Sequence, residues 1–209
     1  MKYKNKFKKM IAAKDKLVFR PLNQNQCNIY FTNDDLMGIE QEVYYEFDDF
    51  GNHFDVYTVE RGNKEITASF QKSKYAYLYM GLMINDALES ETNPIPEEIE
   101  ELDDENESNY EELELLISKY IDPSLFSVFE LKNNSICLTK ENGRYSISFV
   151  DWRGNKNIMS RNRECFGIGL QVVCNYAWTY QYVLEQVKGW HVNPDDDEYL
   201  FIIKKLLGL

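Results

Sequence analysis

The chain has 209 residues, 44% of them hydrophobic and 14% aromatic, and it carries a formal net charge of −12. This length and apolar content predict a folded protein with a substantial core, in one large domain or two small ones. No stretch approaches the roughly 18 apolar residues that span a bilayer, and the apolar run after the basic N-terminus is too short for a signal peptide. We therefore expect a cytoplasmic protein that makes no contact with a membrane.

The cysteines are dispersed and form no C-x-x-C motif. A zinc site needs clustered ligands at characteristic spacings, and a chain of this size without a secretory signal does not favour a disulfide framework. We expect free thiols, and neither a metal nor an organic cofactor. Cys165 and Cys174 stand among aliphatic residues and are interpreted as small core side chains. The four positions are Cys27, Cys137, Cys165 and Cys174.

The first 20 residues hold eight Lys or Arg and one Asp. They predict a basic helix or arm that Pro21 ends, because proline does not continue a helix. A meander of strands follows, with Gly-Asn pairs at 51–52 and 62–63 as hairpin turns, since glycine accepts positive φ and asparagine tolerates it. The predicted strands cover residues 28–32, 42–47, 53–59 and 64–70, and an aromatic helix covers 75–88.

The middle of the chain is strongly acidic. Residues 86–114 carry 14 acidic and no basic side chains, which leaves a charge of +2 on the rest of the chain. Residues 89–109 contain two prolines and few large apolar side chains, and they predict an exposed, partly mobile connector. A helix is predicted to begin near Ser108, which could form a capping box with Glu111, and to end before Pro123.

The second half predicts another meander and two helices. Residues 135–140 and 144–152 are strand-like, and 135–139 is taken as the counterpart of the strand at 28–32. Residues 165–187 predict a long apolar helix whose first turn is weakened by Gly167 and Gly169. Acids at 195–198 and lysines at 204–205 suit the two ends of a C-terminal helix.

A short phrase occurs twice in the chain. The letters RGNKEI at residues 61–66 recur as RGNKNI at 153–158, an offset of 92 residues. Each copy follows a strand-like run and precedes a helical stretch. Two copies favour a duplicated hairpin-and-helix unit and not a solenoid, which needs about three or more repeats. The phrase is interpreted as a repeated turn, although paired basic tips could also contact a ligand.

These elements together predict an α+β fold of two repeated units, each an antiparallel β-meander followed by a helix, with a basic N-terminal helix and an acidic connector. The expected boundaries are residues 1–88 for the arm and first unit, 89–109 for the connector and 110–209 for the second unit with its C-terminal helix. All three could also form one compact domain.

Enzymatic motifs are sparse in this sequence. Its two histidines are His53, beside a predicted turn, and His191, four residues before Asp195. A metal or acid–base pair can be built from His191 and Asp195, but no companion motif supports it, and we predict no enzymatic activity. Tyr3 and Phe7 in the basic arm could stack on bases. The acidic chain favours a solvated helix face instead, so direct nucleic-acid binding is not expected.

Residues 56–64 (VYTVERGNK), followed by Phe70 and an aromatic helix from Lys74, resemble small immunity proteins of bacterial polymorphic toxin systems. In that family a strand, a hairpin similar to Arg-Gly-x-Lys and a helix form a compact α+β unit. The resemblance covers residues 43–88 and, more loosely, 135–187; two copies, the basic arm and the acidic connector depart from the family pattern. It implies a non-enzymatic protein that binds a cognate toxin and neutralises it by stoichiometric occlusion.

We expect the acidic connector to contact a basic surface on that toxin, because nucleases acting on phosphate backbones need such surfaces. A second hypothesis is a solvated linker that only keeps the chain in solution. A third is an acidic phage-type inhibitor that occupies the nucleic-acid site of a defence protein. The candidate partner-binding residues are Glu97, Glu98, Glu100, Glu101, Asp103, Asp104, Glu105 and Glu107.

Overall fold

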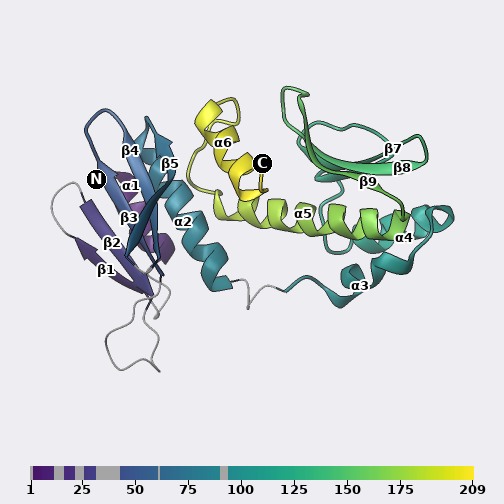
Figure 1. Cartoon of the computed structure of the whole chain (residues 1–209), viewed down its shortest axis with the longest axis horizontal. Coiled ribbons are helices and arrows are strands. Elements are labelled where there is room, and N and C mark those ends of the chain that lie inside the picture. The colour runs from purple at the N-terminus through teal and green to yellow at the C-terminus, as the bar shows by residue number, and fades with distance from the viewer. Residues whose placement is uncertain (1, 12–16, 22–25, 32–42, 61, 90–93) are drawn as a thin grey trace. The chain divides into compact units, whose positions relative to one another are not determined.

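The computed structural model describes residues 2–11, 17–21, 26–31, 43–60, 62–89 and 94–209 (Figure 1). The chain divides into two compact units, residues 1–89 and 90–209, each with its own sheet. Both units combine an antiparallel meander with helices, so the predicted α+β class is confirmed. None of the described helices is both long and apolar enough to cross a membrane.

The first unit contains an antiparallel sheet in the order β1-β2-β3-β4-β5, in which every strand pairs with its sequence neighbours. The predicted strands and the helix at 75–88 are confirmed to within a few residues. The bounds are α1 Lys2–Ile11, β1 Leu17–Pro21, β2 Gln26–Phe31, β3 Val43–Asp49, β4 Phe54–Glu60, β5 Asn63–Phe70 and α2 Ser73–Glu89.

The basic arm differs from the prediction, because Pro21 ends a strand and not a helix. Helix α1 stops at Ile11, and Leu17–Pro21 pairs with β2 at the edge of the sheet. Leucine, valine and phenylalanine suit a pleated surface, and an edge strand tolerates a proline because its missing N–H is not required there. Residues 12–16 lie outside the described part of the chain.

Aromatic side chains join the helices of the first unit to its sheet. The ring of Tyr77 on α2 lies 4.6 Å from that of Phe47 on β3, and Tyr79 lies 5.5 Å from Phe70 on β5. Phe7 on α1 is fully buried and 5.7 Å from Tyr77. Phe7, a candidate for stacking on bases, is therefore a core side chain.

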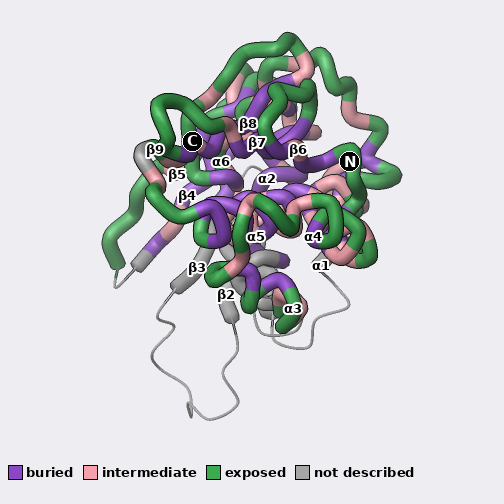
Figure 2. Tube along the Cα trace, turned by 90° about the vertical axis from the view of Figure 1, so that its right-hand side faces the viewer, coloured by how far each residue is buried: buried purple, intermediate pink, exposed green. Residues whose placement is uncertain are grey.

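The second unit contains a sheet in the order β6-β7-β8-β9, in which β6 runs parallel to β7 and the other pairs are antiparallel. Buried positions gather along β7, β8 and the long helix α5, which packs on the sheet (Figure 2). The bounds are α3 Glu97–Glu100, η1 Glu101–Asp104, η2 Glu107–Asn109, α4 Tyr110–Ile117, β6 Phe126–Val128, β7 Ser135–Glu141, β8 Arg144–Val150, β9 Lys156–Arg163, α5 Phe166–Gln186 and α6 Asp197–Leu206.

The two meanders repeat one arrangement at the offset of 92 residues. Strands β3 and β7 span 43–49 and 135–141, and each leads into a hairpin and then a helix, α2 or α5. Gly62 and Gly154 occupy like settings between paired strands, with φ of +81° and +80°. The counterpart of residues 135–139 is therefore β3, and the match to the strand at 28–32 is wrong, because two additional strands precede the first meander.

Two local predictions are also corrected by the structure, and strands β6 and β9 are not among the predicted strand ranges. Three residues, as in β6, are too few to show a period. Helix α4 begins after Asn109, whose side chain makes no cap bond, so the capping box at Ser108 does not form. Cys174 is buried within α5 as predicted, whereas Cys165 is exposed, because it precedes the first turn of α5 and does not share the helix face that packs on the sheet.

Candidate functional site

The eight predicted acidic residues lie on one continuous stretch, residues 97–107, which we call the acidic ribbon. It consists of α3, η1 and the start of η2. Its carboxylates face outward: Glu97, Glu98, Glu100, Glu101, Asp103 and Asp104 are exposed, and Glu105 and Glu107 are half-buried. The structure therefore brings all eight onto one short surface of the second unit.

The acidic ribbon is packed onto α5 and is not a free connector. Ile99 is fully buried and Leu102 nearly so, and the Gln171 side chain donates a 2.5 Å hydrogen bond to the carbonyl oxygen of Glu100. The sequence predicted an exposed connector because only these two apolar residues occur among the acids. Burial of these two side chains is enough to hold the ribbon on α5, since each buried aliphatic side chain contributes about 1.5–3 kcal/mol to stability.

Gly167 allows this close packing. A Cβ atom at Gly167 would lie 2.5 Å from the carbonyl oxygen of Leu102 and closer still to that of Asp103. Such distances are well inside van der Waals contact, so only glycine permits the backbone of η1 to approach α5 this closely. The sequence interpretation treated Gly167 as a weak start of the helix, but the structure shows that it is a packing position.

Three of the eight carboxylates, those of Glu98, Glu105 and Glu107, accept hydrogen bonds within the chain. Glu98 accepts a 2.8 Å hydrogen bond from the Tyr120 hydroxyl, and Glu107 accepts 2.5 Å bonds from Lys140 Nζ and the Tyr145 hydroxyl. The pKa of Glu98 is lowered by its own backbone N–H and by Tyr120, and that of Glu107 by Lys140 and Tyr145. These two residues anchor the ribbon at each end. Glu105 accepts a local bond from Asn109.

The negative charges of the other five carboxylates are not neutralised by any partner among the described residues. In the described part of the chain, they form no hydrogen bond or ion pair. Five like charges on a packed backbone create a local negative field that attracts cations. The five residues are Glu97, Glu100, Glu101, Asp103 and Asp104.

Beside the acidic ribbon lies a cavity of about 410 Å³, which we call the aromatic pocket. Its aromatic wall is formed by Tyr110 and Phe129, whose ring centroids are 5.6 Å apart, and Phe129 stacks on Phe166 at 6.0 Å. Burial, followed by the nearby Glu114 carboxylate, raises the pKa of Tyr110, so its hydroxyl stays neutral. The lining residues are Glu107, Ser108, Asn109, Tyr110, Glu111, Glu112 and Phe129.

Phe129 has a backbone conformation that is unusual for a bulky residue. Its φ is +71°, its side chain is 39% exposed, and its N–H donates a 2.7 Å bond to the carbonyl of Leu138. The left-handed region costs a residue with a side chain about 1–2 kcal/mol. Strained residues cluster at binding sites. Sequence reasoning missed Phe129, because no local pattern signals its φ or its position beside the ribbon.

The repeated Arg-Gly-Asn-Lys phrase is used inside each unit. Lys64 Nζ lies 2.5 Å from Glu46 and 3.2 Å from Asp48 on β3, while Lys156 lies 3.6 Å from Glu141 on β7. Burial opposes the charge of Lys64, but the bonds to its two carboxylate partners outweigh this effect and raise its pKa. The lysine of each copy therefore pairs with the first strand of its own meander, which supports the structural interpretation of the phrase.

Arg153, from the second copy, also pairs within its unit. Its guanidinium donates to Asp197 at 2.6 Å and to the carbonyl of Asp195 at 3.3 Å, at the start of α6. The turn itself is held by Asp151, which is fully buried and accepts bonds from the N–H groups of Arg153 and Asn155. The equivalent Arg61 lies outside the described residues.

The two histidines belong to different units, and His53 Nε2 lies 3.6 Å from a carboxylate oxygen of Asp55. His53 bonds to Asn52 at 2.8 Å beside a hairpin turn, and His191 adopts a φ of +50° in the loop before α6. Asp195 contributes its backbone N–H to Asn193 and its carbonyl to Arg153. Among the residues that the structure describes, no group of three or more His, Cys, Asp or Glu side chains is placed to hold a metal ion.

Comparison of the chain with known protein families, curated proteins and solved structures finds no match.

Proposed function

We propose that this protein is a cytoplasmic, non-enzymatic immunity protein that binds a cognate bacterial toxin and neutralises it by stoichiometric occlusion. The acidic ribbon and the aromatic pocket form the contact surface. The observation that carries the proposal is the set of five uncompensated carboxylates, held on a packed backbone beside a pocket with an aromatic wall. Fixed charges lose little conformational freedom on binding, and this limits the entropic cost of association.

The partner surface that fits is basic, with an Arg or Lys side chain that enters the aromatic pocket. Such a cation would meet the carboxylates of Glu111 and Glu112 and the rings of Tyr110 and Phe129. Carboxylate pairing and contact with an aromatic face both favour a guanidinium, which makes Arg the better fit. The pocket would then supply affinity, while the exposed ribbon mainly raises the association rate.

The packing of the ribbon weighs against the hypothesis of a solvated linker. A linker needs no buried side chains, whereas Ile99 and Leu102 are in the core and Gly167 permits backbone contact. The second candidate function is an acidic inhibitor of a nucleic-acid-binding defence protein, which the same surface would serve. A toxin gene next to the gene for this chain would favour the immunity function. Location of the gene in a phage genome would favour the second candidate function.

The test is protection of bacteria against the toxin encoded beside this chain. We expect the wild-type chain to rescue cells that express the toxin, and the purified pair to form a complex of fixed stoichiometry by analytical size exclusion and calorimetry. A ribbon variant carries Glu97→Gln, Glu101→Gln, Asp103→Asn and Asp104→Asn. A control variant with the same net charge carries Glu65→Gln, Glu164→Gln, Glu185→Gln and Asp195→Asn, all at exposed positions outside residues 97–107.

We expect the control variant to protect as the wild type does and the ribbon variant to require a higher expression level. Equal protection by both variants would show that the ribbon is not the contact surface. Absence of any complex between the wild-type chain and the toxin would reject the immunity function as a whole.

A further inference from the structure

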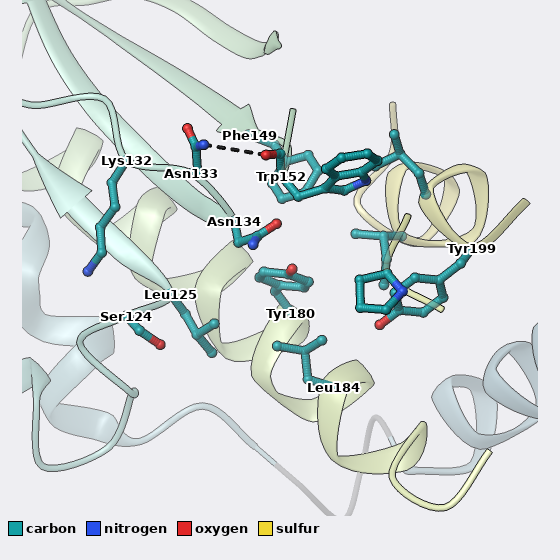
Figure 3. Close-up of a pocket in the computed structure, with 13 residues that line it drawn as sticks. Ser124, Leu125, Lys132, Asn133, Asn134, Phe149, Trp152, Tyr180, Leu184 and Tyr199 are labelled. Atoms are coloured by element: carbon teal, nitrogen blue, oxygen red, sulfur yellow. Dashed lines mark hydrogen bonds between the residues drawn. The ribbon is translucent and has the colours of Figure 1, made fainter. Parts of the chain in front are cut away.

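A second cavity, separate from the acidic ribbon, lies between the sheet, α5 and α6 of the second unit (Figure 3). We call it the cleft; its volume is about 370 Å³. Its lining includes Asn133, Asn134, Phe149, Trp152, Tyr180 and Tyr199.

The walls of the cleft are mainly apolar, and four of the lining residues are aromatic and fixed in place. Phe149 and Tyr180 meet edge to face at 5.5 Å, and Trp152 is held from outside by the guanidinium of Arg153, 4.4 Å from its ring centre. Burial raises the pKa of Tyr199 to about 12, so its hydroxyl is neutral at physiological pH. These aromatic side chains give the cleft an apolar surface that suits a planar ligand.

Helix α6, which forms one side of the cleft, is held in place by two ion pairs. Arg153 bonds to Asp197 at 2.6 Å at the start of α6, and Lys204, near its end, lies 3.4 Å from buried Asp151. The cleft is therefore built by the fold and does not depend on a loose terminal helix. Preformed cavities of this kind are the usual sites of small ligands.

Two polar groups converge on the cleft. The indole Nε1 of Trp152 is buried and has no hydrogen-bond partner, and Figure 3 shows it on the side of the ring that faces the cavity. The Asn134 side chain points into the same space (Figure 3), and its backbone φ is +58°. Asn133 is occupied, because it donates to the carbonyl of Trp152 at 3.4 Å. A buried donor without an acceptor is costly, so a ligand that accepts a bond from this N–H would remove that cost.

The volume sets the size of that ligand. A protein cavity of roughly 150 Å³ holds one benzene ring, and the cleft is between two and three times larger. It therefore accommodates two fused rings. An amide side chain offers an NH2 group as donor and an oxygen as acceptor, and a carbonyl oxygen can accept two bonds.

From these observations we propose that the cleft binds a small planar heterocycle of two fused rings, with a ring carbonyl next to a ring N–H. The carbonyl accepts from Trp152 Nε1 and from the amide of Asn134, and the ring N–H donates to the oxygen of Asn134. The rings pack between Phe149, Tyr180 and Tyr199. This site is independent of the toxin-binding surface proposed above.

The test uses the full-length, ¹⁵N-labelled chain and quinolin-2(1H)-one as the probe. The chain has three tryptophans, Trp152, Trp178 and Trp190, and each gives one indole signal in a ¹H–¹⁵N spectrum. We expect the Trp152 signal to shift downfield and to saturate below about 1 mM probe. Trp178 is the internal control, because its Nε1 is also buried without a partner but does not line the cleft.

Two variants remove the polar contacts while they keep the walls. Trp152→Phe retains an aromatic ring without the donor, and Asn134→Gly removes the amide at a backbone angle that glycine adopts readily. Trp152→Phe should weaken probe binding by roughly five- to tenfold, the equivalent of one hydrogen bond, and Asn134→Gly should weaken it further, because it removes two. Binding to Trp152→Phe is followed through the signals of Asn133 and Asn134, and 1-methylquinolin-2-one, which lacks the N–H, should also bind more weakly to the wild type.

Three results would overturn the proposal. One is the absence of a saturable shift at Trp152. Another is equal affinity of the wild type for the two probes, or unchanged probe affinity in both variants. Either result would mean that the cleft binds aromatic rings without the proposed hydrogen bonds. The last is a Trp152 shift that only a protein partner produces, which would make the cleft part of a protein interface.

Discussion

Replacing Gly167 with alanine should destabilise the second unit, although alanine is the better helix former. Alanine gains up to about 1 kcal/mol over glycine inside a helix. Its Cβ would lie 2.5 Å from the carbonyl oxygen of Leu102, and this backbone atom has to retreat by almost 1 Å to reach ordinary contact. Overpacking of this kind costs about 1–3 kcal/mol. If the acidic ribbon detaches, the burial of Ile99 and Leu102 is also lost, about 1.5–3 kcal/mol each.

The expected net loss is about 2 kcal/mol if the ribbon shifts and up to about 5 kcal/mol if it detaches, measured by urea unfolding. Gly169→Ala is the matched control, since it lies on the same helix and its added Cβ would meet Leu138 Cδ1 at 3.0 Å. That methyl group belongs to a side chain that can rotate, so this change should stay within about 1 kcal/mol of wild type.

The acidic ribbon reports its own displacement through a protease that cleaves after glutamate. In the wild type its backbone is held on α5, so cleavage between residues 97 and 107 should be slow. Cleavage there should accelerate in Gly167→Ala and remain slow in Gly169→Ala. If Gly167→Ala is as stable as Gly169→Ala and its ribbon is no more sensitive, the backbone contact does not hold the ribbon in place.

Three further predictions concern single residues. Burial by itself opposes the charge of Asp151, but bonds from Asn155 and Lys204 outweigh it and lower its pKa; Asp151→Asn should therefore cost about 2–3 kcal/mol at neutral pH. Because a lowered pKa stabilises the fold above the unfolded value of about 3.9, this difference should shrink as pH falls below 4, and a constant difference would contradict it. One thiol, that of exposed Cys165, should react quickly with a disulfide reagent in the folded chain, since burial raises the pKa of Cys27 and Cys174 to about 12; Cys165→Ser should abolish the fast phase, and a fast phase that persists would refute the assignment. Phe129→Gly relieves a strained φ but loses ring contacts, so stability should change by less than about 1 kcal/mol while toxin binding weakens at least tenfold; unchanged binding would remove Phe129 from the interface.

Local signals allowed much of the fold to be predicted. A hairpin forms at both repeated phrases as predicted, with positive φ at Gly62 and Gly154. The Gly-Asn pair is not the whole turn, because Asn63 already pairs with Glu60 and the second loop runs from Val150 to Lys156. The long helices α2 and α5 were predicted from the spacing of their apolar residues, which is also a local signal. By contrast, Leu17–Pro21 forms a strand because a partner strand lies beside it, which the basic pattern of the arm does not encode.

Only part of the candidate site could be predicted from the sequence. The eight acids were visible as composition, but the packing that turns them into a surface depends on Ile99, Leu102 and Gly167, which are distant in sequence and ordinary in isolation. The partial neutralisation of Glu107 likewise requires Lys140 and Tyr145 from the sheet. Contacts of this kind arise from tertiary structure, so no local pattern indicates them.

The most direct test of the toxin-binding surface is the association rate with the cognate toxin as a function of salt. Stopped-flow fluorescence would compare the wild type with the ribbon variant and with the control variant of equal charge. We predict that at low salt the ribbon variant associates about tenfold more slowly than the wild type and shows a shallower decline with salt, while the control follows the wild type. The same rate and the same salt slope for the ribbon variant and the wild type would contradict the account.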